Sequence, residues 1–258
     1  MEHLKICGTD FERMLRGGLQ NLRAHEREIN DLNVFPVPDG DTGTNMRLTL
    51  ENGVRSAPSR RPTGAYLQAV SQGMLMGARG NSGVILSQIF RGIFLELSHS
   101  GHINAQNLAA AFVRGYRTAY AAVVNPTEGT VLTVCREAAE KVRSVPIDRY
   151  TPVDAVLSRY LYEMKQSLAR TPELLPVLKE AGVVDSGAQG YIVLCEGMLL
   201  ALRGETDKIG VPETAQEAAP GAEKLAEETV PDASLFNEWS PFTDGYCLEF
   251  LLQRMKSG

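Results

Sequence analysis

Two aspartates one residue apart, Asp39 and Asp41, carry the most distinctive chemistry in this sequence. They lie in the stretch Asn33-Val-Phe-Pro-Val-Pro-Asp-Gly-Asp-Thr-Gly-Thr-Asn-Met46. Hard cations such as Mg²⁺ take oxygen ligands, and proteins usually hold them with one or two carboxylates plus the phosphates of a substrate. The glycine between the two acids lets the backbone turn so that both carboxylates can face the same side. The residues that follow are small or carry hydroxyl groups: Thr42, Gly43 and Thr44. A helix can begin there, and the N–H groups of its first turn would favour a bound phosphate.

A plain turn and a calcium-binding loop compete with a magnesium site for this stretch. An Asp-Gly-Asp tripeptide in a loop is most often a solvated turn. A calcium-binding EF-hand loop needs a glycine at its sixth position and a glutamate at its twelfth. Counted from Asp39, these positions hold Thr44 and Leu50, which excludes an EF-hand. The prolines before the acids and the Thr-Gly-Thr-Asn run after them make a plain turn the weaker interpretation.

A second stretch of small residues, Gly77-Ala-Arg-Gly-Asn-Ser-Gly-Val84, opens an apolar helix. Backbone N–H groups at the positive end of a helix, beside the guanidinium of Arg79, would suit an anion. The alternative is a turn between two helices, in which the glycines allow close packing. On the residues alone the anion site and the packed turn have equal weight.

Two later turns have a similar composition. Glu128-Gly-Thr130 precedes a helix, and its glycine could let a flat ligand lie against the backbone. Glu128 is equally well interpreted as an acid in a first helical turn, where the helix dipole favours it. Asp185-Ser-Gly187 opens a further helix, and Asp185 is there either a ligand contact or only an N-cap.

The size and composition of the chain restrict the function classes. The 258 residues suffice for one large domain, or for one domain and part of a second. The formal net charge is −5, and the eight acidic and two basic side chains of residues 204–232 contribute −6 of it. The rest of the chain is near neutral, which argues against broad nucleic-acid binding.

The sequence shows neither a membrane span nor an export signal. No run of about 18 apolar residues could cross a bilayer, and the first residues lack the pattern of a secretory signal. The four cysteines are scattered and form no Cys/His cluster, so we expect reduced thiols in a cytoplasmic protein. They are Cys7, Cys135, Cys195 and Cys247.

Hydrophobic periodicity predicts about eight amphipathic helices and no convincing strand in the body of the chain. The first helix is expected over 9–31, where Gly17 and Gly18 would let another helix approach closely. Glycine- and acid-bearing turns recur at three or four helix starts. This distribution favours an all-α antiparallel barrel or bundle whose loops gather at one end around a phosphorylated ligand. The remaining helices are expected over 44–54, 65–77, 104–123 and 151–168, with a short one from 171 and a last one over 185–203. Two more open from the stretches 77–84 and 125–130 and run to about 97 and 142.

The composition divides the chain into three predicted regions. Residues 1–203 would form the helical domain. Residues 204–235 are rich in Glu, Ala, Pro, Thr and Gly, which is typical of an acidic flexible linker. Residues 236–258 are apolar and β-prone, and a single strand cannot bury itself. We therefore expect them to begin a following domain, and the sequence to be one piece of a longer protein.

Four motifs together resemble a known family. They are Asn33–Met46, Ala78-Arg-Gly-Asn-Ser-Gly83, Glu128-Gly-Thr-Val-Leu-Thr133 and Val184-Asp-Ser-Gly-Ala-Gln-Gly190. In this order they look like the ATP-binding N-terminal domain of bacterial fatty acid kinase, which is homologous to the nucleotide-binding domain of dihydroxyacetone kinase. The resemblance covers about residues 5–203. It implies an antiparallel barrel of eight amphipathic helices that binds ATP and two Mg²⁺ ions at one rim.

The resemblance also implies roles for single residues. Asp39 and Asp41 match acids that hold the metal and so serve the catalysed reaction. Asn33 matches a third metal ligand that is an aspartate in dihydroxyacetone kinase, with Asp31 as the less favoured substitute. The residues that match the nucleotide-binding motifs are Thr42, Gly43, Thr44, Asn45, Gly80, Asn81, Ser82, Gly83, Gly129, Thr130, Asp185, Ser186 and Gly187.

For the whole domain, the resemblance implies transfer of the γ-phosphate of ATP to the carboxylate of a fatty acid. A separate fatty-acid-binding protein would present that acid, and later domains would help to engage it and could form a homodimer. Without those domains we expect the chain to bind ATP but to phosphorylate fatty acid weakly. The alternatives are a regulatory module that holds Mg-nucleotide without turnover, and a kinase of another small substrate such as a dihydroxyacetone-like triose.

Overall fold

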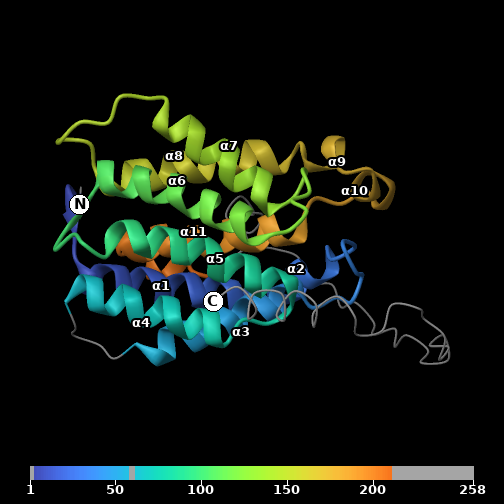
Figure 1. Cartoon of the computed structure of the whole chain (residues 1–258), viewed down its shortest axis with the longest axis horizontal. Helices are drawn as coiled ribbons and strands as arrows, with labels where there is room; N and C mark the ends of the chain where they lie inside the picture. The colour runs from blue at the N-terminus through green and yellow to red at the C-terminus, as the bar shows by residue number, and fades with distance from the viewer. Residues whose placement is uncertain (1–2, 58–61, 211–258) are drawn as a thin grey trace, which may run out of the picture. The chain divides into compact units, whose positions relative to one another are not determined.

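The computed structural model describes residues 3–57 and 62–210. Within these ranges the chain forms 11 α-helices, one 3₁₀ helix and two strands of two residues each. Eight helices have 13 residues or more and make up the body of the molecule (Figure 1). They are α1 (Gly8–Ala24), α3 (Thr42–Ser56), α4 (Thr63–Met76), α5 (Gly80–Leu97), α6 (Ala105–Ala122), α7 (Val131–Arg143), α8 (Val153–Leu168) and α11 (Ser186–Arg203).

These long helices pack lengthwise, and each runs opposite to the long helix before it (Figure 1). The main packing pairs are α1 with α11, α3 with α4, α5 with α6 and α7 with α8. Because directions alternate, α3, α5, α7 and α11 all begin at the same end, on the right of Figure 1. The prediction of an all-α antiparallel bundle is confirmed. Over the described ranges the helices close into no barrel.

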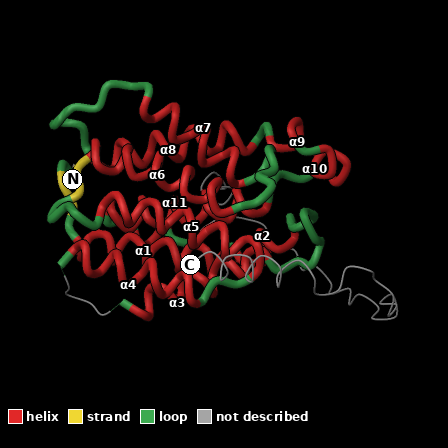
Figure 2. Tube along the Cα trace, in the orientation of Figure 1, coloured by secondary structure: helices red, strands yellow, loops and turns green. Residues whose placement is uncertain are grey.

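The two strands lie at the opposite end of the bundle, where Figure 2 shows them in yellow. β1 (Lys5–Ile6) pairs antiparallel with β2 (Ile103–Asn104), with Lys5 opposite Asn104. The sequence predicts no strand in this region. Two residues are too few to show the alternation of apolar and polar side chains by which a strand is recognised.

The predicted helix over 9–31 is wrong in one respect, because the chain breaks at His25. That residue leaves the helical conformation, with φ −106° and ψ 12°, and ends α1. A separate short helix, α2 (Glu26–Asp31), then follows at the end where α3 begins (Figure 1). Two more short helices lie between α8 and α11: α9 (Thr171–Leu174), which was predicted, and α10 (Pro176–Ala181), which was not.

One predicted helix start shifts. α3 begins at Thr42 rather than Thr44, with Asp41 as its N-cap. α7 begins at Val131, directly after the stretch 125–130 that was predicted to start it, and Gly129 in that stretch has a left-handed φ of +80°.

The close approach predicted at Gly17 is confirmed, and the partner is α11. A Cβ on Gly17 would lie 2.5 Å from Cβ of Ala201. A Cβ on Gly197 would lie 2.5 Å from the backbone oxygen of Gly17. Only glycine at both positions allows this distance between the helices. Gly17 of α1 and Gly197 of α11 therefore both contribute to the close α1–α11 contact.

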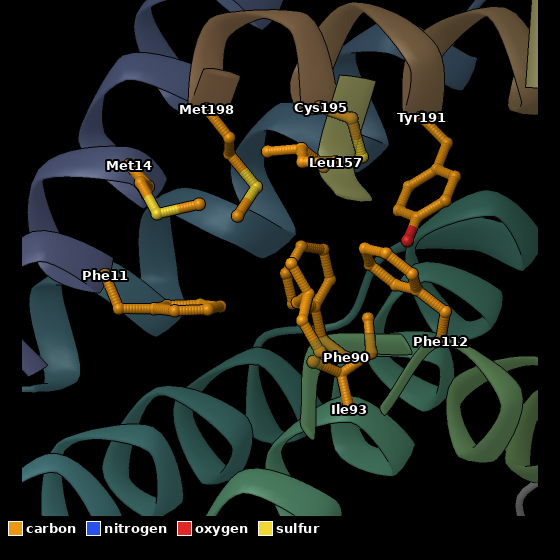
Figure 3. Close-up of a pocket in the computed structure, with 10 residues that line it drawn as sticks. Phe11, Met14, Phe90, Ile93, Phe112, Leu157, Tyr191, Cys195 and Met198 are labelled. Atoms are coloured by element: carbon orange, nitrogen blue, oxygen red, sulfur yellow. The ribbon is translucent and has the colours of Figure 1, made fainter. Parts of the chain in front are cut away.

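Aromatic side chains fill the middle of the bundle. The rings of Phe112 and Tyr160 stack with centroids 3.8 Å apart, and Phe11 meets Phe94 edge to face at 5.8 Å. Beside them lies a narrow apolar cavity with about 10 Å³ of water-accessible space (Figure 3). Its lining comes from α1, α5, α6, α8 and α11, and includes Met14, Cys195 and Met198, whose side chains Figure 3 shows.

The chain remains packed beyond the predicted domain end at 203. A 3₁₀ helix (Thr206–Lys208) follows α11, Ile209 is buried, and the amide of Gly210 donates to the side chain of Asn21 at 2.9 Å. The first residues of the predicted linker are therefore held against α1. The remainder of that linker and the predicted strand after 236 lie outside the described residues.

Candidate functional site

Four helix starts meet at one end of the bundle, and a small pocket lies between them. It is lined by Met46 of α3, Ser82 of α5, Val131 of α7 and Gly187 of α11, with further apolar side chains of α5 below. Each of these four residues lies in the first or second turn of its helix. The four motifs that the sequence singles out thus come together in space, although they are spread over more than half of the chain.

The loop before α3 is pinned through the side chain of Asn33, which is buried. Its amide nitrogen donates to Oδ1 of Asp39 at 3.0 Å and to the backbone oxygen of Val37 at 2.6 Å. Its amide oxygen accepts the hydroxyl of Thr42, the first residue of α3. Thr42 Oγ1 in turn accepts the hydroxyl of Ser186, the first residue of α11, at 3.2 Å. Asn33 therefore ties the first aspartate to the starts of two helices.

The carboxylates of Asp39 and Asp41 lie near each other without a positively charged partner among the described residues. Asp39 is exposed and Asp41 is half-buried. Burial raises the pKa of Asp41, a hydrogen bond from Asn45 opposes this, and the nearby charge of Asp39 raises it further. Within the described ranges no Lys, Arg or His side chain pairs with either carboxylate. Two adjacent carboxylates without a positive partner fit a divalent cation, for which acidic oxygens are the preferred ligands.

The alternative third ligand, Asp31, is the last residue of α2 and is exposed. Over the described part of the chain it forms no group of three metal-ligating acids with Asp39 and Asp41. Asn33, by contrast, contacts Asp39 directly. Of these two residues, Asn33 is the one that lies against Asp39, through its amide nitrogen.

The first amides of α3 are already used within the protein. Gly43 N–H and Thr44 N–H both donate to Oδ1 of Asn30, at 2.7 and 3.3 Å. The hydroxyl of Thr44 donates to Glu26 at 2.6 Å. A Cβ on Gly43 would lie 2.6 Å from the backbone oxygen of Glu26, so the glycine lets α2 pack against the helix start. These two predicted phosphate donors therefore have partners from α2.

The start of α5 is open by comparison. Its N-cap Arg79 makes no side-chain cap, and no carboxylate of the described residues pairs with the Arg79 guanidinium. The amides of residues 80–82 have no acceptor in the described part of the chain, and Asn81 is exposed. Such uncapped first-turn amides are the groups that bind anions at helix N-termini.

Close packing, the alternative weighed for this stretch, is also correct. Gly80 has φ +56°, and a Cβ there would lie 2.3 Å from Nδ2 of Asn45. A Cβ on Gly83 would lie 2.3 Å from Oγ1 of Thr49, which also accepts the Arg79 amide at 3.2 Å. The glycines hold α5 tightly against α3, and in doing so they bring its free amides close to the aspartate loop.

The turn before α7 is braced by side chains. Gly129 N–H donates to Oγ1 of Thr133 at 2.9 Å, and that hydroxyl donates to Glu128 at 2.7 Å. Arg136 makes two hydrogen bonds to Glu128, at 2.8 and 2.9 Å. Partial burial opposes the charge of Glu128, but the bonds from Thr133 and Arg136 outweigh it and lower the pKa of Glu128. Glu128 lies before α7, which begins at Val131, so it is not the first-turn acid of one predicted interpretation. It fixes the shape of the turn.

Asp185 is the N-cap of α11, which is one of the two roles that the sequence predicts for it. Its carboxylate accepts the amide of Ala188 at 2.8 Å and also the amide of Val131, the first residue of α7. It therefore caps two helix starts at once. The side chain is buried, and burial raises the pKa of Asp185 to about 6 against the opposing effect of these two hydrogen bonds.

The sequence-based reasoning missed the residues of α2 that hold the start of α3. Asn30 and Glu26 lie one helical turn apart, and both contact Thr44. Arg47 continues the set by donating to Glu26 at 2.6 Å. The spacing of four residues between the acid and the amide was the available signal, since such residues share one face of a helix.

With this geometry described, comparison with known proteins gives the family. Residues 36–200 match the DAK2 domain family, and the matched segment contains the aspartate pair and the three later helix starts. The chain belongs to the DAK2 domain family.

Several bacterial proteins are similar to almost the whole chain. Protein YloV of Bacillus subtilis is 43% identical over 250 residues, which is 96% of this chain and 44% of YloV. An uncharacterized protein of Staphylococcus saprophyticus is 42% identical over 254 residues, again 96% of this chain and 44% of the relative. The chain therefore spans less than half the length of these relatives.

Among solved structures, the fold is similar to that of a dihydroxyacetone kinase from C. freundii, determined in complex with AMP-PNP and Mg²⁺. The match has a TM-score of 0.55 and 16% sequence identity, and covers 77% of this chain and 35% of that chain. At this identity the likeness concerns the fold. In the described residues, no helix is long and apolar enough to cross a membrane.

Proposed function

We propose that this chain is the ATP- and Mg²⁺-dependent phosphoryl-donor domain of a fatty acid kinase. It transfers the γ-phosphate of ATP to the carboxylate of a fatty acid that a separate binding protein presents. The observation that carries the proposal is the meeting of four helix starts beside two carboxylates without a positive partner. Supporting it are the DAK2 family match and the fold shared with a kinase studied with AMP-PNP and Mg²⁺.

The residues divide between metal and phosphate. Asp39 and Asp41 would hold the cation, with Asn33 orienting Asp39 and completing the cluster. Mg²⁺ bound there, as one ion or the two that the family resemblance implies, would neutralise charge on the β- and γ-phosphates. The free amides around Ser82 would take up the charge of the transferred group, with Arg79 adding a positive side chain at the same helix start.

The proposed reaction needs positioning rather than covalent work by the protein. A carboxylate oxygen of the fatty acid attacks the γ-phosphorus, and the bond to the oxygen that bridges the β- and γ-phosphates breaks. The products are an acyl phosphate and ADP, and no proton has to be removed from the attacking carboxylate. A general base is accordingly unnecessary, which agrees with the lack of a buried His, Lys or unpaired Glu lining the described pocket.

Two further functions remain as alternatives. The first is a regulatory module that keeps bound Mg-nucleotide and never turns it over, for which the same aspartate pair would serve. The second is phosphorylation of a small triose, which the likeness to a dihydroxyacetone kinase raises. Because the relatives are more than twice as long as this chain, we expect weak transfer to fatty acid by residues 1–258 alone.

The first experiment is a calorimetric titration of AMP-PNP with and without Mg²⁺, on the unchanged chain and on Asp41→Ala. We expect binding that requires Mg²⁺ and that falls by at least about tenfold in the variant, because a metal ligand is lost. Asp207→Ala is the matched control, since it removes an exposed aspartate from the 3₁₀ helix after α11. It should bind as the unchanged chain does.

The outcomes separate the candidate functions. Tight, slowly exchanging binding with no phosphate transfer to any acceptor would favour the regulatory module. Mg²⁺-dependent binding with phosphate transfer to dihydroxyacetone, and none to fatty acid on its binding protein, would favour the triose kinase. No binding of AMP-PNP under either condition would contradict a nucleotide site in this domain.

A further inference from the structure

The side chain of Asn30 makes three hydrogen bonds to the start of α3, although it belongs to α2. Its amide oxygen accepts Gly43 N–H at 2.7 Å and Thr44 N–H at 3.3 Å, and its amide nitrogen donates to Thr44 Oγ1 at 3.1 Å. The N-cap of α3, Asp41, makes no cap bond with its own side chain. A helix's own N-cap side chain normally accepts hydrogen bonds from the first-turn amides. Here Asn30, from the neighbouring helix α2, accepts them instead.

The position of Asn30 is itself reinforced. Thr44 Oγ1, which receives its bond, donates onward to Glu26 at 2.6 Å. Glu26 accepts from Arg47 at 2.6 Å, and Arg47 also pairs with Glu51 at 2.9 Å. Bonds from Thr44 and Arg47 lower the pKa of Glu26 although its partial burial acts against this, so the acceptor is a stable carboxylate. α2 and the first three turns of α3 are thereby joined as one unit.

This unit determines where the aspartate pair is placed. Asp41 directly precedes α3, and Thr42, its first residue, bonds to Asn33, which holds Asp39. A shift in the start of α3 would therefore move both carboxylates relative to α5. Asp41 makes no cap bond with its own side chain, although Asn45 donates a hydrogen bond to its carboxylate. Asn30 supplies the acceptor for the first amides of α3 instead.

We propose that Asn30 is a positioning residue for the cation site: by capping α3 in place of Asp41, it leaves the Asp41 carboxylate available for Mg²⁺. The inference rests on the proposed function, because it assumes a cation at Asp39 and Asp41. Without the Asn30 amide, the N–H groups of Gly43 and Thr44 lose their acceptor, and the side chain of the N-cap residue Asp41 is the group that normally takes that role. A carboxylate that caps a helix is a poorer metal ligand. Changes to residues that orient metal ligands typically cost 10- to 100-fold in metal affinity.

The test measures the Mg²⁺ concentration that gives half-maximal binding of AMP-PNP. We expect Asn30→Ala to raise it by about tenfold or more. Asn30→Asp keeps an oxygen that can accept from Gly43 and Thr44, and should return the requirement close to that of the unchanged chain. The matched control is Asn21→Ala. Asn21 is also a buried amide that joins two helices, since it donates to the backbone oxygen of Val193 at 2.7 Å, but it contacts no residue of the site.

Thermal melting of each variant separates positioning from general stability. Asn21→Ala should lower the melting temperature without changing the Mg²⁺ requirement. If Asn30→Ala does not fold, Glu26→Ala weakens the same unit by removing the acceptor of Thr44, and should raise the Mg²⁺ requirement in the same direction. A lower melting temperature for Asn30→Ala with an unchanged Mg²⁺ requirement would overturn the inference while the proposed function stands. Binding by the unchanged chain that needs no Mg²⁺ would overturn both.

Discussion

The starts of α5 and α11 differ in structure, although their sequences are alike. Both open with small residues, and both have an N-cap with an extended backbone: φ −124° and ψ 136° at Arg79, φ −64° and ψ 118° at Asp185. At α11 the carboxylate of Asp185 accepts the amides of Ala188 and Val131, so that start is closed. At α5 the cap is a cation that accepts nothing, and the amides stay open.

This difference shows what separates a structural turn from a candidate ligand site. Small residues permit close packing in both places, so they do not distinguish the two. The distinguishing feature is whether an acceptor from the protein satisfies the first-turn N–H groups. By that criterion α11 and α3 have internal partners, from Asp185 and Asn30, and α5 is the start that is left for an external anion.

The closed start predicts an unusual dependence of stability on pH. The pKa of Asp185 is raised from 3.8 to about 6 by burial. A raised pKa in the folded state means that the protonated acid is favoured by folding. The stabilisation is therefore complete below about pH 4 and is lost as the pH rises through about 6, and a shift of this size corresponds to about 3 kcal/mol. Relative to Asp185→Asn, the unchanged chain should lose unfolding free energy as the pH rises from about 4 to about 6.

Urea unfolding at several pH values, analysed as the difference between the two proteins, isolates this group from all other titrations. Asp207→Asn is the control, because it makes the same chemical change at an exposed site. The change at Asp185 should depend on pH more steeply than this control. A flat difference for Asp185→Asn would mean that Asp185 is not the buried double cap described above.

The open start can be converted into a closed one by Arg79→Asp. The extended backbone at this N-cap suits a capping aspartate, and we expect a gain in stability of about 1 kcal/mol. AMP-PNP affinity should fall on the order of a hundredfold, since a charge-assisted hydrogen bond is worth about 1.5–3 kcal/mol and a repulsive charge replaces it. Calorimetry in the presence of Mg²⁺ measures the loss, and urea unfolding measures the gain.

Arg79→Ala provides the control, because it removes the charge without adding a cap. It should weaken AMP-PNP binding less than Arg79→Asp and leave stability nearly unchanged. If Arg79→Asp binds AMP-PNP within about threefold of the unchanged chain, the phosphates do not lie at the start of α5, and the distinction between open and closed starts has no bearing on the ligand.

The fold was largely predictable, because its long helices carry a strong hydrophobic period. The exceptions are local. The break at His25 is not visible, because the residues on both sides of it continue a helical pattern. The pairing of β1 with β2 joins residues about a hundred positions apart, and no local pattern of two residues can indicate it.

The sequence predicts which residues gather at the site. It does not predict which of them are hydrogen-bonded within the protein and which line the pocket. Composition places Thr44 and Ser82 alike at helix starts, yet Thr44 is bonded to Asn30 and Glu26 while Ser82 lines the pocket. That division depends on α2, whose contact with α3 is a tertiary feature. Asp185 illustrates the same point, since only the arrangement in space shows that it also reaches Val131 of α7.

Glycine-to-alanine changes sharpen the comparison with the smallest expected effects. Gly80→Ala places a Cβ at φ +56°, 2.3 Å from Nδ2 of Asn45, and we expect it to cost about 1–2 kcal/mol in unfolding free energy, since the left-handed region is strained for alanine. Gly187→Ala, in the first turn of α11, has no such conformation, and its nearest neighbour would be Oδ2 of Asp185 at 3.3 Å. We expect that change to lie within about 1 kcal/mol of neutral, because alanine's better helix propensity offsets the tight contact.

Equal losses of unfolding free energy for the two variants would contradict this difference between α5 and α11, since they would mean that Gly80 is no more constrained than Gly187. A larger loss at Gly80, with weaker AMP-PNP binding in that variant alone, would show that the open start depends on its left-handed residue.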